Sequence, residues 1–238
     1  MSPGRPIVTF ASTRRDVSAQ SWSWGAFRPK KKETRHDSCE STGGVSMRAV
    51  IIYESMFGNT HVIADAIAEG LESLDDVVVV PVGEAGRERL SDADLLVVGG
   101  PTHFHGMSRT GTRKGAAATA RNPKNDLVLD RDAQGPGVRD WLRSLGHGHM
   151  KFATFDTRFK GPAALRGRAS KVMSRKLRKH GYEMVAKPES FFVTLKNHVE
   201  PGEAARAQEW GKRLAARVVT DGVASADGPR RPPTSKET

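Results

Sequence analysis

One continuous apolar run, Ala49–Tyr53, limits most strongly what this chain can fold into. Apolar residues at every position are typical of a strand buried on both faces, as in a parallel sheet covered by helices. A helical spacing follows over residues 61–74, where Ile63, Ile67 and Leu71 recur on one stripe. A buried strand that leads directly into an amphipathic helix predicts a protein of the α/β class.

The same alternation of strand and helix continues along the chain to residue 218. Further apolar runs predict four more strands, at Val77–Val80, Asp94–Val98, Phe152–Phe155 and, as one interrupted strand, Tyr182–Ala186 with Ser190–Leu195. Helical spacing predicts helices at Val138–Leu145, Ala164–His180 and about Pro201–Val218. Five strands that alternate with helices predict an open, doubly wound, five-stranded parallel sheet.

Composition separates this central region from the two ends of the chain. Residues 1–46 show no sustained helical or strand period and are rich in Ser, Thr, Gly and Pro. We expect them to be a disordered extension, or to lie upstream of a true translation start at Met47. Residues 219–238 are expected to form a disordered tail. One folded domain over residues 47–218 is therefore predicted.

Charge and composition narrow the class of protein. No apolar stretch is long enough for a transmembrane helix, the first 30 residues lack an apolar signal segment, and Cys39 is the single cysteine. We therefore expect a cytoplasmic protein without a membrane span. The net charge is +11, and residues 151–218 hold sixteen Lys and Arg against six Asp and Glu. Such an excess favours contact with an acidic partner, although no nucleic-acid-binding motif accompanies it.

The segment that follows the first strand, Glu54–Thr60, combines hydroxyl, glycine and amide residues at the start of a helix. Backbone N–H groups are unpaired there and the helix dipole is positive, so the segment suits a phosphate group. It contains no lysine and does not match the GxxxxGK[ST] or GxGxxG patterns. The alternative is an ordinary strand-to-helix turn in which Asn59 or Thr60 caps the helix.

Three segments together resemble the flavodoxin family. Residues 55–60, Ser-Met-Phe-Gly-Asn-Thr, resemble its phosphate loop, and the Ser-Met-Phe-Gly variant is similar to that of the flavodoxin-like quinone reductases. Residues 101–107 are similar to the loop along the flavin ring. Residues 156–159 follow the fourth strand, where the family places a second loop against the ring. The resemblance covers about residues 47–218 and implies a flavodoxin-like fold, strand order 2-1-3-4-5, and bound flavin mononucleotide (FMN).

The resemblance also implies which residues bind the cofactor. The phosphate would be held by Ser55, Met56, Phe57, Gly58, Asn59 and Thr60. The ring would be flanked by Pro101, Thr102, His103, Phe104, His105, Gly106, Asp156, Thr157, Arg158 and Phe159. Phe104 and Phe159 would cover the ring faces. Because these loops hold no Trp or Tyr, a more open flavin face or weaker binding is expected.

These observations predict an FMN-binding flavodoxin-like protein that either carries electrons or works as a small flavin-dependent oxidoreductase. If it is an enzyme, we expect an oxidoreductase of the NAD(P)H:quinone type. Its partner would be a redox protein or a small-molecule electron donor or acceptor; no metal site is expected. The alternative is a flavodoxin fold that lacks flavin and acts as a basic binding module for an acidic protein or nucleic acid. Residues 111–136 are expected to be a long loop. It would be either a flexible insertion, or a segment that covers the flavin or docks a partner. In the second case Arg109, Arg113 and Lys114 would meet an anionic substrate or a nicotinamide dinucleotide.

Overall fold

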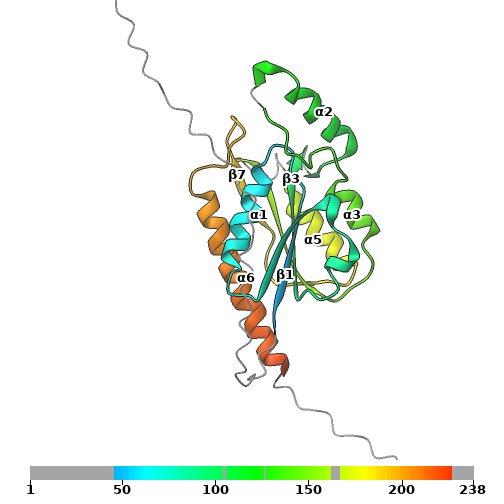
Figure 1. The fold of residues 1–238 in the computed structure, drawn as a ribbon, viewed down its shortest axis with the longest axis vertical. Coiled ribbons are helices and arrows are strands. Elements are labelled where there is room, and N and C mark those ends of the chain that lie inside the picture. The colour runs from blue at the N-terminus through cyan, green and yellow to red at the C-terminus, as the bar shows by residue number, and fades with distance from the viewer. Residues whose placement is uncertain (1–45, 104–105, 126, 162–166, 227–238) are drawn as a thin grey trace, which may run out of the picture. The chain divides into compact units, whose positions relative to one another are not determined.

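The computed structural model describes residues 46–103, 106–125, 127–161 and 167–226 (Figure 1). The expectations for residues 1–45, for Phe104 and His105, and for residues 227–238 lie outside the described residues. Among the residues that the structure does describe, no helix is both long and apolar enough to cross a bilayer.

A parallel sheet forms the centre of the domain. Its principal strands are β1 (Arg48–Tyr53), β2 (Asp76–Pro81), β3 (Leu95–His103), β5 (Lys151–Phe159) and β7 (Glu189–Val193). They lie in the order 2-1-3-5-7, which confirms the predicted flavodoxin-like order 2-1-3-4-5. The fifth strand is interrupted as predicted, because β6 (Glu183–Met184) pairs with the start of β5 and β7 pairs with its end.

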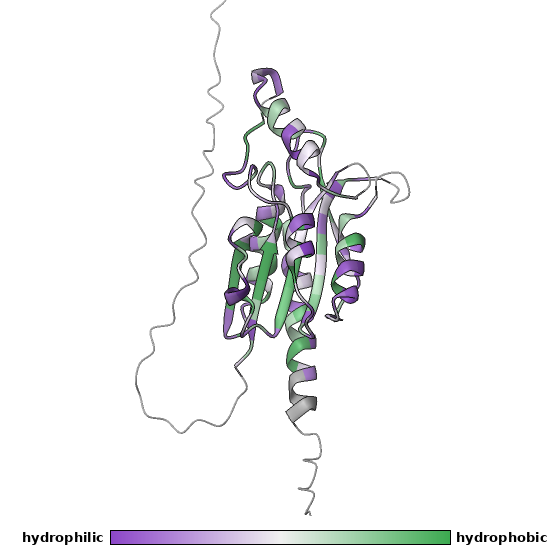
Figure 2. Ribbon diagram, turned by 90° about the vertical axis from the view of Figure 1, so that its right-hand side faces the viewer, coloured by the Kyte–Doolittle hydropathy of each residue, from purple (hydrophilic) through white to green (hydrophobic). Residues whose placement is uncertain are grey.

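Helices cover both faces of the sheet, as the apolar run in β1 requires. Ala49, Ile51 and Tyr53 pack in one apolar cluster with α1 (Asn59–Gly70) and α6 (Glu203–Ala226). Val50 and Ile52 pack in a second cluster with α3 (Val138–Ser144) and α5 (Ala169–Lys179). Successive residues of a strand point to opposite faces, so β1 must be apolar throughout. Figure 2 shows the resulting hydrophobic strands between more hydrophilic helices.

Glycines allow α1 and α6 to approach more closely than side chains would permit. A Cβ atom at Gly70 would overlap the carbonyl oxygen of Gln208, and one at Gly211 would overlap the carbonyl oxygen of Ile67. The two helices therefore meet backbone to backbone over the sheet.

Two strands are longer than predicted, and two of the expected loops are therefore partly wrong. Residues 101–103 belong to β3, which pairs with β5 and with the short antiparallel β4 (Gly106–Met107). Residues 156–159 belong to β5, which pairs there with β7. The prediction ended both strands too early, because it relied on apolar runs and the last residues of β3 and β5 are mostly polar. The connection from β2 to β3 contains only the 3-10 turns η1 (Val82–Glu84) and η2 (Arg87–Arg89).

Two further boundaries also differ from the expectation. The region expected as a loop, residues 111–136, contains α2 (Thr110–Ala120) and the 3-10 turn η3 (Pro123–Asn125). The helix forms because Arg113 and Ala117 on one of its faces are buried. The last helix, α6, continues to Ala226, so residues 219–226 are helical rather than part of a tail.

Candidate functional site

The loop after β1 has the backbone that an anion site needs. Gly58 precedes α1 with φ 84° and ψ −21°, a left-handed conformation that favours glycine. The Ser55 hydroxyl accepts a hydrogen bond from the Gly58 N–H at 3.0 Å. The loop lies at the carboxyl end of β1, between β2 and β3, where the strand order reverses. Ligands of open α/β sheets bind at such a point.

Two contacts join this loop to distant parts of the chain. The hydroxyl groups of Thr60 and Thr157 lie 2.7 Å apart, so the first and third expected segments meet. The side-chain amide of Asn59 donates to the backbone oxygen and to Oδ1 of Asn197, at 3.1 and 3.0 Å. Asn197 adopts φ 61°, which asparagine tolerates better than most residues. Asn197 was not predicted, although its place in a polar turn after the fifth strand is a signal.

The ends of β3 and β5 hold the first turn of α5. Thr102 Oγ1 accepts the N–H of Ala169 at 2.9 Å. Oδ2 of the fully buried Asp156 accepts from the N–H and the hydroxyl of Ser170, at 2.8 and 2.9 Å. Both side chains therefore have a structural role at the helix N-terminus.

The other expected ring residues differ in exposure. Pro101 and Gly106 are half-buried, Phe159 is 39% exposed, and Phe104 and His105 are outside the described residues. Arg158 is buried, with its guanidinium 4.9 Å from the centre of the Phe192 ring. Burial, followed by the charge of Arg113, lowers the pKa of His103, so this ring is mostly neutral at pH 7. In the phosphate loop, Met56 is buried and Phe57 is half-buried.

A carboxylate that was not predicted, that of Asp130, lies beside residues 55–60, the segment expected to bind phosphate and named the phosphate loop for that reason. The N–H of Asp130 donates to the carbonyl oxygen of Met56 at 2.9 Å. The Asp130 side chain is 7% exposed, and its Oδ2 lies 3.7 Å from Nδ1 of His61, an ion-pair distance rather than a hydrogen bond. Burial by itself would raise the pKa of Asp130, but His61 and the Ser55 hydroxyl outweigh burial and lower it. Asp130 is therefore charged at neutral pH.

These contacts decide how well the loop suits the phosphate of FMN. The left-handed glycine and the N-terminus of α1 fit a phosphate group. The Thr60 hydroxyl and the Gly58 N–H, however, already have partners within the protein. Asp130 adds a negative charge beside the loop, which opposes a phosphate dianion. The backbone of the loop therefore fits a phosphate group, while the charge of Asp130 opposes one.

A buried polar network lies on the other side of the loop. One oxygen of Glu54 accepts from the Ser108 hydroxyl, and the other accepts from the N–H of Val138 at 2.9 Å. Arg113 Nη1 donates to the Ser108 hydroxyl at 3.2 Å, and its Nη2 lies 3.5 Å from Oδ2 of Asp140. Burial raises the pKa of Glu54, while the two hydrogen bonds and Arg113 act against that rise. Arg113 is therefore part of this network, which joins α2 to α3.

Removing the Arg113 cation is expected to destabilise the fold. Arg113→Gln leaves the buried carboxylate of Glu54 without its nearby positive charge, at a cost of about 2–3 kcal/mol in free energy of unfolding. Arg143→Gln is the matched control, since Arg143 also pairs with Asp140 but is 64% exposed against 9% for Arg113. The control should change stability by less than about 0.5 kcal/mol. If urea denaturation shows the same loss of unfolding free energy for both variants, the proposed role of Arg113 in the buried network is wrong.

The His61–Asp130 pair should make stability depend on pH. Burial lowers the pKa of His61, but Asp130 and Asp65 outweigh burial and raise it above the ordinary value. A raised histidine pKa stabilises the fold below the unfolded pKa, and this contribution is lost as pH rises through the folded pKa. The lowered pKa of Asp130 adds stability above the ordinary aspartate pKa, which is lost under acidic conditions.

Urea denaturation at several pH values tests this expectation. The contribution of His61 to the unfolding free energy should decrease by up to about 1 kcal/mol between weakly acidic and weakly alkaline pH, whereas His103, whose pKa is lowered, acts in the opposite direction. His61→Gln should flatten this dependence, and His198→Gln, at an exposed histidine, should not. If the stability of His61→Gln depends on pH as strongly as that of the unmodified protein, groups other than His61 cause the dependence.

Comparisons with known proteins agree with the topology. A family model described as a flavodoxin domain matches residues 50–111, about a quarter of the chain. The resemblance to flavodoxins is therefore confirmed over this stretch, which includes residues 55–60 and 101–107. Among curated proteins, none matches this sequence significantly.

Solved structures with a similar course of the chain include several flavodoxins. A flavodoxin from the domain Archaea is 18% identical with a TM-score of 0.49, over 72% of this chain and 99% of its own. A WrbA-like flavodoxin from Agrobacterium tumefaciens is 20% identical with a TM-score of 0.48, over 74% and 99%. Flavodoxin 1 from Bacillus cereus is 19% identical with a TM-score of 0.47, over 73% and 97%. The flavodoxin-like assignment of the fold rests on the strand order itself.

Proposed function

We propose that this protein binds FMN and uses it to transfer electrons, either to a redox partner or to a small-molecule substrate. The observation that carries the proposal is the left-handed Gly58 between strand β1 and the N-terminus of α1. The match of the flavodoxin domain model to the surrounding residues supports it. The contact between Thr60 and Thr157 further supports a common site for the first and third segments.

The protein would contribute binding and orientation, and the flavin, when bound, would supply the electron or hydride chemistry. The backbone N–H groups at the start of α1 and the Ser55 hydroxyl would hold the phosphate. Residues 101–103 at the end of β3, together with Gly106, would border the ring. His103, mostly neutral because burial and Arg113 lower its pKa, keeps one ring N–H with which to donate a hydrogen bond.

Visible absorption of the purified protein, before and after addition of FMN, tests the proposal. Flavin absorption bands and quenched flavin fluorescence are expected on binding. Gly58→Val should weaken FMN binding by at least about tenfold, because valine strains the left-handed backbone at the loop. Gly202→Val is the matched control, since Gly202 also has φ 84° at the start of a helix, with open space around it. Unchanged FMN fluorescence with the unmodified protein would overturn the proposal.

One observation favours the alternative of a basic binding module. Helix α5 contains no acidic residue, and its exposed cations Lys171, Arg175, Arg178 and Lys179 have no ion pair within the described residues. A positive surface of this kind suits an acidic protein, which includes an acidic redox partner of a flavoprotein. Polyglutamate is a suitable acidic probe. This function would be supported if the unmodified protein binds polyglutamate in a salt-sensitive manner and the double variant Lys171→Glu with Arg175→Glu does not. Equal binding by both proteins would contradict it, and binding of duplex DNA alone would identify nucleic acid instead.

A further inference from the structure

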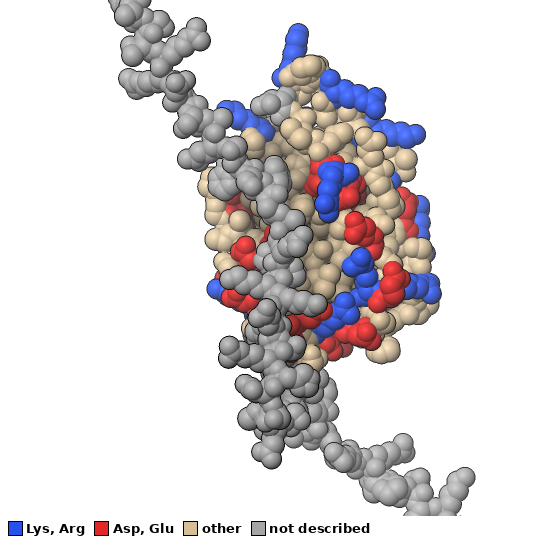
Figure 3. Space-filling view, viewed as in Figure 1, with Lys and Arg blue, Asp and Glu red and all other residues tan. Residues whose placement is uncertain are grey.

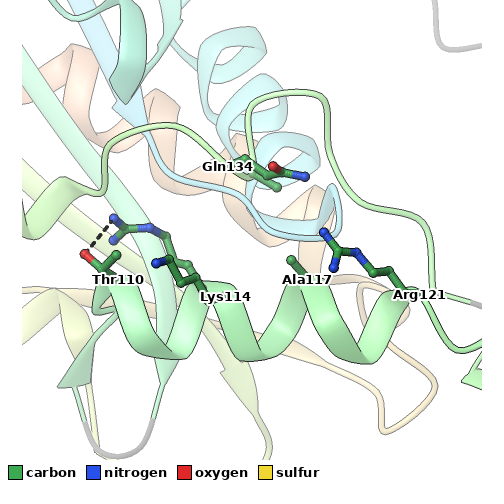
Figure 4. A pocket seen from close by; sticks show the side chains of 7 residues that line it. Thr110, Lys114, Ala117, Arg121 and Gln134 are labelled. Atoms are coloured by element: carbon green, nitrogen blue, oxygen red, sulfur yellow. Dashed lines mark hydrogen bonds between the residues drawn. The ribbon is translucent and has the colours of Figure 1, made fainter.

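A pocket of about 400 Å³ lies along α2, separate from the residues of the phosphate loop. A volume of this size is typical of sites for small molecules. The pocket is bordered by seven residues, Thr110, Arg113, Lys114, Ala117, Arg121, Ala133 and Gln134. Figure 4 shows the labelled side chains of α2 on the side of the helix that faces the loop carrying Gln134. The pocket therefore lies between a helix and the segment that returns toward α3.

The lining is positively charged. It contains three cationic side chains and no acidic one. Arg113 is engaged by Ser108 and Asp140. Lys114 and Arg121 are exposed and have no ion pair among the residues that the structure describes. Figure 3 shows Lys and Arg side chains at the upper end of the molecule, where Figure 1 places α2. Two positive groups are thus available to a ligand.

The pocket combines apolar surface with two positive groups, those of Lys114 and Arg121, which lie at different points along the axis of α2. Ala117 and Ala133 are both buried, at 9% and 3% exposure, and supply the apolar surface from opposite sides. Lys114 lies within α2 and Arg121 directly follows its last residue, so the two are seven residues apart, about two turns or roughly 10 Å along the helix axis. An occupant would therefore meet one positive group at either end and methyl groups between them.

We propose that this pocket binds an organic anion, a small molecule with an apolar body and one or two acidic groups such as sulfonate, carboxylate or phosphate. Lys114 and Arg121 would pair with the acidic groups, and Ala117 and Ala133 would contact the body. The inference goes beyond the proposed function, because it uses no residue of the phosphate loop and requires no FMN.

A pair of fluorescent probes tests the proposal in the full-length protein without added FMN. 1-Anilinonaphthalene-8-sulfonate carries one sulfonate on an apolar ring system, and N-phenyl-1-naphthylamine is its uncharged analogue. The sulfonate probe should bind saturably, and more tightly than the uncharged one. Lys114→Gln combined with Arg121→Gln should weaken sulfonate binding by about tenfold. Added salt should also weaken it, since partly exposed charges are screened.

The matched control is Lys171→Gln combined with Arg175→Gln, which removes the same charge from α5. It should leave sulfonate binding unchanged, and thermal melting should show that both double variants are folded. The proposal is overturned if the uncharged probe binds equally well, if the sulfonate probe does not saturate, or if both double variants weaken binding equally. A failure of the protein to bind FMN in the absorption experiment would leave these results unaffected, so the two proposals fail separately.

Discussion

Asp130→Asn is expected to tighten FMN binding by at least about tenfold. In the unmodified protein Asp130 lies beside the phosphate loop, because its backbone N–H donates to the carbonyl oxygen of Met56 and its carboxylate Oδ2 faces His61. A phosphate dianion must displace this charge or tolerate it, and two like charges a few ångströms apart repel by about 1–4 kcal/mol near a protein surface. Asparagine keeps the shape of the side chain and removes the charge, so titration of flavin fluorescence should show the gain directly.

Asp132→Asn is the control for this prediction. Asp132 lies two residues further along the same segment, is 30% exposed at its side chain and pairs with Arg131. Its neutralisation should change FMN affinity by less than about threefold, because exposed charges are screened. Weaker FMN binding by Asp130→Asn would show that Asp130 assists the cofactor instead of opposing it. Absence of FMN binding in all three proteins would refute the proposed function itself.

The second large effect is expected where α1 meets α6. Gly211→Ala places a methyl group against the carbonyl oxygen of Ile67, which is backbone and cannot rotate away. The helices must separate, and we expect a loss of about 2–4 kcal/mol in the free energy of unfolding. The measurement is urea denaturation followed by circular dichroism.

Gly115→Ala provides the comparison in another helix. Gly115 also lies inside a helix, but a Cβ atom there would meet nothing within 4 Å. Alanine should therefore stabilise α2 by about 0.5–1 kcal/mol, through helix propensity alone. If Gly211→Ala were equally harmless, the close approach of α1 and α6 would be wrong.

The sheet was predictable because its signal is local. Each of the five strands contains an apolar run, and β1 is apolar at every position because both of its faces are covered. The ends of β3 and β5 were missed for a physical reason. Thr102, Asp156 and Thr157 are polar, and their place in strands depends on partners in α5 and the phosphate loop that no local pattern displays.

For the candidate site, the sequence predicted only the residues that belong to continuous motifs. The phosphate loop follows β1 directly, so its position at a helix N-terminus could be read from the order of residues. Asp130 and Asn197 could not be assigned in this way, since they lie about 70 and 140 positions from the loop residues that they contact. Likewise α2 has two internal glycines and was expected to be a loop. Burial of Arg113 and Ala117 outweighs that weak propensity.

The interrupted fifth strand also affects how this protein behaves beside other copies of itself. An exposed sheet edge offers unpaired backbone groups to which another chain can add a strand. Here the edge is divided at Lys187 and Pro188, and arginines donate to its carbonyl oxygens: Arg168 to Pro188 and Arg217 to Val185, both at 2.6 Å, and Arg206 to Ser190. These three carbonyl oxygens are therefore already engaged within the protein. This edge thus offers fewer free acceptors to an added strand than an uninterrupted strand would.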